Sequence, residues 1–119
     1  MMKYSNGILT TITNVGGISE ARKVAAMAQA AYITVAPHNP NGPLATVESA
    51  HLAASIPNFL MLEHRGQIED VARGEEVVSP PLKLEDGKLL LPEGPGWGME
   101  LNEAVRAHYT GPRFGFEPL

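Results

Sequence analysis

The first half of the chain alternates short strand patterns with helix patterns, and this order restricts the folds open to it. Strands are expected at 8–13, 32–36 and 58–63, and helices at 18–31 and 44–55. β-Branched residues fill the first two strand segments, whereas the helices repeat apolar residues at spacings of three and four. Because only short loops separate these segments, the strands are expected to pair in parallel through right-handed helical crossovers. The sequence therefore predicts an α/β fold.

Small apolar residues define the expected buried faces of both helices. In the first helix these are Ile18, Ala21, Val24, Ala25 and Ala28, and in the second Val47, Ala50, Ala53 and Ala54. The many alanines indicate close packing against a neighbouring element. Pro57 is expected to end the second helix. The continuous apolar run 59–62 that follows is typical of a strand buried on both faces.

The second half of the chain changes character after His64. The segments 82–84 and 88–91 flank Glu85-Asp86-Gly87, a sequence that favours a tight hairpin turn. Asn102 is expected to cap a last short helix over 101–109. A helical turn, a loop and an extended tail are expected at 67–72, 92–98 and 110–119.

Composition excludes several classes of function. The 119 residues suffice for one small domain, and their net charge of −4 provides no basic face for nucleic acid or an anionic membrane. No apolar run approaches the length of about 18 residues that a membrane span needs. The absence of cysteine excludes disulfides and thiolate metal sites, and it fits a cytoplasmic protein.

The loop 36–43 carries the histidine best suited to proton transfer. Three prolines restrict the backbone around His38, which follows the second strand segment closely. Free histidine titrates near neutral pH and therefore serves as a base or an acid. Glu63 ends the third strand segment, and the carboxyl ends of parallel strands meet at one edge. We therefore expect His38 and Glu63 at the same edge, while the alternative for a lone loop histidine is a solvated polar role.

The other polar residues have simpler interpretations. His51 is expected to pack within the second helix, His64 to lie at the rim, and His108 to lie near a helix C-terminus, where positive charge is favourable. The acidic residues of the second half are interpreted as a solvated face: Asp70, Glu75 and Glu76. Trp97 lies between glycines and is expected to be buried, filling a junction, with contact to a partner as the alternative.

Several motifs occur in an order that resembles one enzyme family. They are GGISEARK at 16–23, APHNPNGP at 36–43, LE at 62–63, LP at 91–92 and GPGWG at 94–98. Together they resemble the C-terminal part of the mandelate racemase and muconate lactonising enzyme family, within the enolase superfamily. The histidine loop most resembles the galactonate and gluconate dehydratase branch.

The resemblance implies the C-terminal portion of an enolase-type TIM (β/α) barrel with about three β/α units. Residues 8–66 match strands six to eight, and residues 67–119 match the segment that returns to the family's capping domain. Family members bind one Mg²⁺ and remove the proton α to a substrate carboxylate. His38 matches the base or acid histidine after the seventh strand. Glu63 matches the acid after the eighth, which hydrogen-bonds the substrate carboxylate or the enediolate.

The sequence departs from the family at one site position. Five residues before Gly16, where the family has an aspartate that orients the histidine, this chain has Thr11. Threonine can hydrogen-bond an imidazole but supplies no negative charge, so His38 is expected to be a weaker base. The Mg²⁺ ligands of the family lie on the third to fifth strands, before the region that this chain matches. We therefore expect no metal ligand in this chain, and a gene truncated upstream is one explanation.

Two hypotheses for function follow. The first is a Mg²⁺-dependent sugar-acid dehydratase, a hydro-lyase that uses His38 and Glu63, with a racemase or epimerase of the same family as a variant. The second is a non-catalytic remnant or interaction module, because three barrel strands leave two sheet edges open. The expected partners are a small-molecule carboxylate and either further copies of the chain or a missing N-terminal portion.

Overall fold

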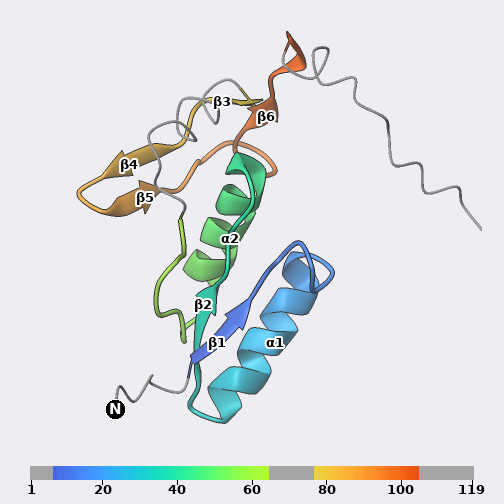
Figure 1. Ribbon diagram of the computed structural model, residues 1–119, viewed down its shortest axis with the longest axis vertical. Helices are drawn as coiled ribbons and strands as arrows, with labels where there is room; N and C mark the ends of the chain where they lie inside the picture. The colour runs from blue at the N-terminus through green and yellow to red at the C-terminus, as the bar shows by residue number, and fades with distance from the viewer. Residues whose placement is uncertain (1–6, 65–76, 105–119) are drawn as a thin grey trace, which may run out of the picture.

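A parallel strand pair joined by a helix forms the first unit of the fold (Figure 1). The computed structural model of the chain describes residues 7–64 and 77–104. The unit comprises β1 (Gly7–Thr10), α1 (Ile18–Ala30) and β2 (Thr34–Pro37). β1 and β2 pair in parallel, from Gly7 opposite Thr34 to Thr10 opposite Pro37. The predicted parallel pairing through a helical connection is confirmed.

β1 is shorter than the predicted strand 8–13 because the chain turns directly after it. The backbone N–H groups of Asn14 and Val15 both donate to the carbonyl oxygen of Thr11, at 3.0 and 3.1 Å. Gly17 then precedes α1 with a φ of 89°, a left-handed conformation that favours glycine. The turn therefore brings the start of α1 back beside the strand pair.

The second helix, α2 (Pro43–Ser55), follows the histidine loop. Its proline lies in the first turn, where the absent N–H has no helical partner to lose. The helix ends before Pro57, as predicted. Ala54 is exposed, contrary to prediction, because it lies next to the end of α2 and beyond Leu52, the last buried residue of this helix.

Among the described residues, two small hydrophobic clusters of the core lie between the helices and the strand pair. One joins Ile12, Ala21 and Leu52, and the other joins Ala25, Ala28 and Val35. Ile56 packs against both clusters and thereby connects them. The buried alanines of α1 confirm the predicted close packing of that helix.

The third predicted strand is only partly formed. Residue Phe59 makes a single parallel bridge with Val35 of β2. Phe59, Leu60 and Met61 are all exposed, so the prediction of a strand buried on both faces is wrong. Within residues 7–64 and 77–104, no further strand or helix covers the outer side of this segment, and its apolar side chains therefore remain at the surface.

The predicted hairpin is present in the second half. β4 (Lys83–Glu85) and β5 (Lys88–Leu90) pair in antiparallel register around Asp86 and Gly87. Both turn residues have positive φ, 49° and 74°. This conformation is the one that an Asp-Gly turn provides between two strands, and the prediction is confirmed.

A second short pairing was not predicted. β3 (Val78–Ser79) pairs in antiparallel register with β6 (Glu100–Leu101), beyond one end of α2 in the view of Figure 1. Leu101 is therefore a strand residue and not the first residue of a helix. The Asn102 side chain accepts a 3.1 Å hydrogen bond from the Ala104 N–H, as the predicted cap requires.

Other predictions concern residues outside the described ranges. They are the helical turn 67–72, the helix 101–109 beyond residue 104, the tail 110–119, His108, and the acidic residues Asp70, Glu75 and Glu76. In the described part of the chain, no helix is long and apolar enough to cross a membrane.

Candidate active site

His38 lies immediately after the last residue of β2. Its backbone N–H donates a 2.9 Å hydrogen bond to the carbonyl oxygen of Thr10, the last residue of β1. The ladder between the two strands therefore continues into the start of the histidine loop. This bond fixes the backbone of His38 at the carboxyl edge of the sheet, where the sequence predicted it.

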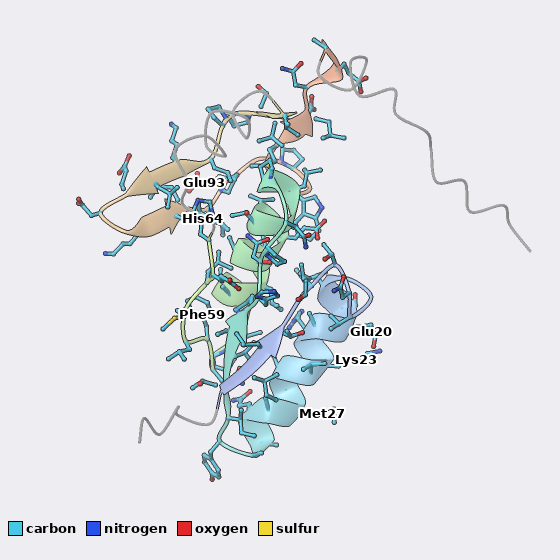
Figure 2. The ribbon with its side chains drawn as sticks, in the orientation of Figure 1. Glu20, Lys23, Met27, Phe59, His64 and Glu93 are labelled. Atoms are coloured by element: carbon cyan, nitrogen blue, oxygen red, sulfur yellow. The ribbon has the colours of Figure 1, made fainter. Side chains whose placement is uncertain are left out.

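The segment that carries Glu63 runs parallel to β2 and brings the carboxylate to the same edge. The Val35 N–H donates to the Asn58 carbonyl oxygen at 2.8 Å, and the Leu60 N–H donates to the Val35 carbonyl oxygen at 2.9 Å. The Glu63 N–H then donates to the Pro37 carbonyl oxygen at 3.3 Å. Phe59 and His64, near the two ends of this segment, are labelled in Figure 2.

The side chains of His38 and Glu63 are in direct contact. The Nδ1 atom of His38 hydrogen-bonds the Oε2 atom of Glu63. The same oxygen accepts a 3.3 Å hydrogen bond from the backbone N–H of Asn39. Both side chains are partly exposed, 42% for His38 and 46% for Glu63, so a solute can reach the pair. The expected juxtaposition of an imidazole and a carboxylate is therefore present.

A buried polar pair holds the loop 36–43 against the first turn of α2. The Asn39 side chain is 1% exposed, and its Nδ2 donates a 2.7 Å hydrogen bond to Thr46 Oγ1 in the first turn of α2. The Thr46 hydroxyl donates in turn to the Gly42 carbonyl oxygen at 3.2 Å. A second, exposed bond joins Asn41 Nδ2 to Thr13 Oγ1 at 3.0 Å. The loop is thus held from α2 and from the turn after β1.

Sequence reasoning missed Asn39 and Thr46. Asn39 lies in the loop and Thr46 in the helix that follows, so no helix or strand period relates them and no local pattern marks them as partners. The only local signal for Asn39 is its place between Pro37 and Pro40. Asparagine is common in loops, so this place does not indicate a buried hydrogen bond.

Thr11, the expected orienting position, lies in the turn after β1 and is partly buried. Its carbonyl oxygen accepts the two turn hydrogen bonds described above. The Nδ1 of His38 contacts Glu63 instead of Thr11. The neighbour of the imidazole therefore comes from the strand segment on the opposite side of β2 from β1.

The remaining described histidines lie outside this contact. His51 is partly buried on α2, its Nε2 lies 3.2 Å from the Trp97 carbonyl oxygen, and the two ring centroids are 5.5 Å apart. Trp97 therefore joins the loop 92–98 to α2, consistent with its expected place at a junction. His64 Nε2 is buried and makes no hydrogen bond with any described residue.

The described residues do not form a metal site. Within 7–64 and 77–104, no group of three or more histidine, aspartate or glutamate side chains could hold a metal ion. The one carboxylate at the sheet edge, that of Glu63, is engaged by His38 and by the Asn39 N–H. A Mg²⁺ site of the kind that the resemblance implies does not fit these residues alone.

Comparison with known proteins relates the chain to one enzyme group. Residues 5–105 match the family model described as enolase C-terminal domain-like. The chain is 39% identical to the D-xylonate dehydratase of Haloferax volcanii over 85% of its length, and 35% identical to a D-galactonate dehydratase family member of Streptomyces bingchenggensis over 93%. These alignments cover 24% and 26% of the two relatives, so the chain spans about a quarter of their length.

A solved structure agrees with the sequence match. The mandelate racemase/muconate lactonizing enzyme from a Sulfitobacter species superimposes with a TM-score of 0.76 at 39% identity, over 90% of this chain and 26% of that protein. The family match covers most of the chain, and the fold and several motifs agree with it. The chain therefore belongs to the mandelate racemase and muconate lactonising enzyme family of the enolase superfamily.

Proposed function

We propose that this chain supplies the proton-transfer part of the active site of a Mg²⁺-dependent sugar-acid dehydratase. One observation carries the proposal: His38 Nδ1 contacts the Glu63 carboxylate at the carboxyl edge of the strands. Catalytic groups of barrel enzymes gather at this edge. The names of the two dehydratase relatives support the class of reaction and the class of substrate.

In the proposed reaction, His38 accepts the proton on the carbon α to the substrate carboxylate. The electrons of that C–H bond form an enediolate. The protonated His38 then returns the proton to the β-hydroxyl, which leaves as water, and the resulting enol tautomerises to a 2-keto-3-deoxy acid. Glu63 Oε2 faces the imidazole, so Oε1 is the oxygen proposed to accept a hydrogen bond from a hydroxyl group of the substrate. In other enzymes, a positioned general base accelerates such a proton transfer by roughly 10²- to 10⁴-fold.

We propose that Mg²⁺, when bound, stabilises the negative charge that develops on the substrate carboxylate. The described residues lack a site for it. The proposed metal ligands therefore lie on further strands of a complete barrel, outside residues 7–64 and 77–104.

We also propose two functional parts within the chain. Residues 8–66 form the barrel part, and residues 67–119 form the segment that returns to a capping domain. In support, β1 and β2 form one sheet, whereas the strands after residue 77 pair only among themselves. The contact between His51 and Trp97 joins the two parts.

Replacing the matching quarter of the Haloferax volcanii D-xylonate dehydratase with this chain gives a chimera that contains the remaining strands, and incubating it with Mg²⁺ and a panel of aldonic acids tests the proposed function. We expect 2-keto-3-deoxy acids to form, their formation to stop when a chelator removes the metal, and His38→Ala to lower the rate at least 10²-fold (roughly). Glu85→Gln, which removes a charge from the exposed hairpin, is the control and keeps full activity. Epimerised substrate without keto acid contradicts the dehydratase proposal.

One observation favours a second candidate, a non-catalytic interaction module. Leu9 of β1 is 70% exposed, and within the described residues β1 pairs only with β2. An open, apolar sheet edge is a surface that binds other chains. A folded chimera that forms no product from any acid in the panel supports this candidate over the enzyme.

A further inference from the structure

We propose that Glu63 is a positioning residue that selects the tautomer of His38, with the ring proton on Nδ1 and the lone pair on Nε2. The proposal deepens the proposed function and rests on it for the identity of the reaction. The geometry on which it depends is the contact between Nδ1 and Glu63 Oε2.

The chemistry of the two partners assigns the proton. An ionised carboxylate only accepts hydrogen bonds, whereas a neutral imidazole has one donor and one acceptor nitrogen. Nδ1 of His38 is therefore the donor in its contact with Glu63. Nε2 is left unprotonated, and it is the nitrogen that can accept a proton from a substrate.

Backbone hydrogen bonds hold both partners in place. The His38 N–H donates to Thr10 across the sheet edge, and the Glu63 N–H donates to Pro37. The Asn39 N–H donates to the same Glu63 oxygen that contacts the imidazole. Two donors from adjacent residues thus converge on one oxygen atom, which limits the rotation of both side chains.

This arrangement changes the role expected of Thr11. The sequence placed the orienting group on the strand before the histidine, where threonine supplies no charge. In the structure a carboxylate from the other side of β2 contacts the ring. Glu63 therefore supplies the negative charge that Thr11 cannot supply.

His51 provides an internal reference, because its hydrogen bond favours the opposite tautomer. Its Nε2 lies 3.2 Å from the carbonyl oxygen of Trp97, and a carbonyl oxygen only accepts. Nε2 of His51 is therefore the protonated nitrogen, and Nδ1 carries the lone pair. The same chain is expected to contain two neutral histidines with opposite tautomers.

Nitrogen-15 NMR of the full chain, at a pH at which the rings are neutral, tests the proposal. The pyrrole-type resonance of His38 is expected at Nδ1, and that of His51 at Nε2. Single histidine variants assign the signals. In Glu63→Ala, which removes the acceptor, His38 is expected to lose its preference for the Nδ1 proton while His51 keeps its own signals, and Glu85→Gln leaves both rings unchanged.

The outcomes separate this proposal from the proposed reaction. A pyrrole-type Nε2 at His38 in the unmodified chain overturns the positioning role, whatever the activity, and so does an unchanged His38 in a folded Glu63→Ala variant. A protonated Nδ1 in a chain whose chimera shows no dehydratase activity supports the positioning role and contradicts the reaction. The measurement on the unmodified chain decides the question even if Glu63→Ala does not fold.

Discussion

Asn39 Nδ2 donates a 2.7 Å hydrogen bond to Thr46 Oγ1, and this buried bond joins the histidine loop to the first turn of α2. Asn39 also provides the backbone N–H that contacts Glu63. One residue therefore connects the helix, the loop and the carboxylate. The position of His38 depends on a polar pair that takes no part in the proposed chemistry.

Thr46→Val tests the contribution of this pair to stability. Valine has the shape of threonine but leaves Asn39 Nδ2 buried without an acceptor, which costs about 1–3 kcal/mol. We expect the free energy of unfolding, measured by denaturant titration, to fall by that amount. Thr13→Val removes the equivalent acceptor for Asn41 at an exposed site, and its effect is expected to stay within about 0.5 kcal/mol. Equal losses in the two variants contradict this account.

Leu52→Ala tests the packing between α2 and the rest of the core. Leu52 is fully buried with Ile12 and Ala21, so truncation leaves a cavity that the neighbouring helix fills only in part. The expected loss is about 2–5 kcal/mol in the free energy of unfolding. Leu84→Ala, at a side chain that is 45% exposed on the hairpin, is the control and costs less than about 1 kcal/mol. A small effect at Leu52 means that the two helices do not pack as described.

Gly98→Ala tests the loop that carries Trp97. A Cβ atom at this position lies 2.6 Å from Pro92 Cβ and 2.9 Å from the Pro92 backbone, so the loop must open. Gly96 also has a positive φ, 64°, but a Cβ atom there meets nothing within 4 Å. Gly96→Ala therefore carries only the conformational cost, about 1–2 kcal/mol.

Fluorescence measures the difference between these two variants directly, because Trp97 is the only tryptophan in the sequence. Gly98→Ala is expected to separate Trp97 from His51 and to shift its emission to longer wavelength. Gly96→Ala is expected to leave the emission unchanged. The prediction fails if both variants give the same spectrum.

Local patterns predicted the elements that depend on local chemistry. The alanine spacing predicted α1, and Asp86-Gly87 predicted the hairpin, because each signal describes the residues that form the element. The placement of His38 and Glu63 at one edge followed from the topology of parallel strands. Burial of the segment after Asn58 was predicted wrongly, because burial depends on what covers a segment and not on its own apolar residues.

Contacts between distant residues were not predictable in this way. The pairing of β3 with β6 involves two residues in each strand, which is too short for an alternating pattern. A sequence does not indicate which of the two ring nitrogens of His38 faces Glu63, because this depends on the orientation of the ring. In the structure the contacting nitrogen is Nδ1. The sequence therefore placed His38 and Glu63 at one edge, and the structure shows which ring nitrogen contacts the carboxylate.

Leu9→Lys tests whether the exposed sheet face binds a second copy of the chain. Ile8 packs into the core beside α1, so its neighbour Leu9 points to the opposite face of the sheet and is 70% exposed. We expect the chain to associate with itself as its concentration rises, because an open edge with apolar side chains favours pairing. Sedimentation velocity over a range of concentrations measures this association. Leu9→Lys is expected to weaken it and Leu101→Lys, on β6, to leave it unchanged; a chain that stays monomeric throughout contradicts the prediction.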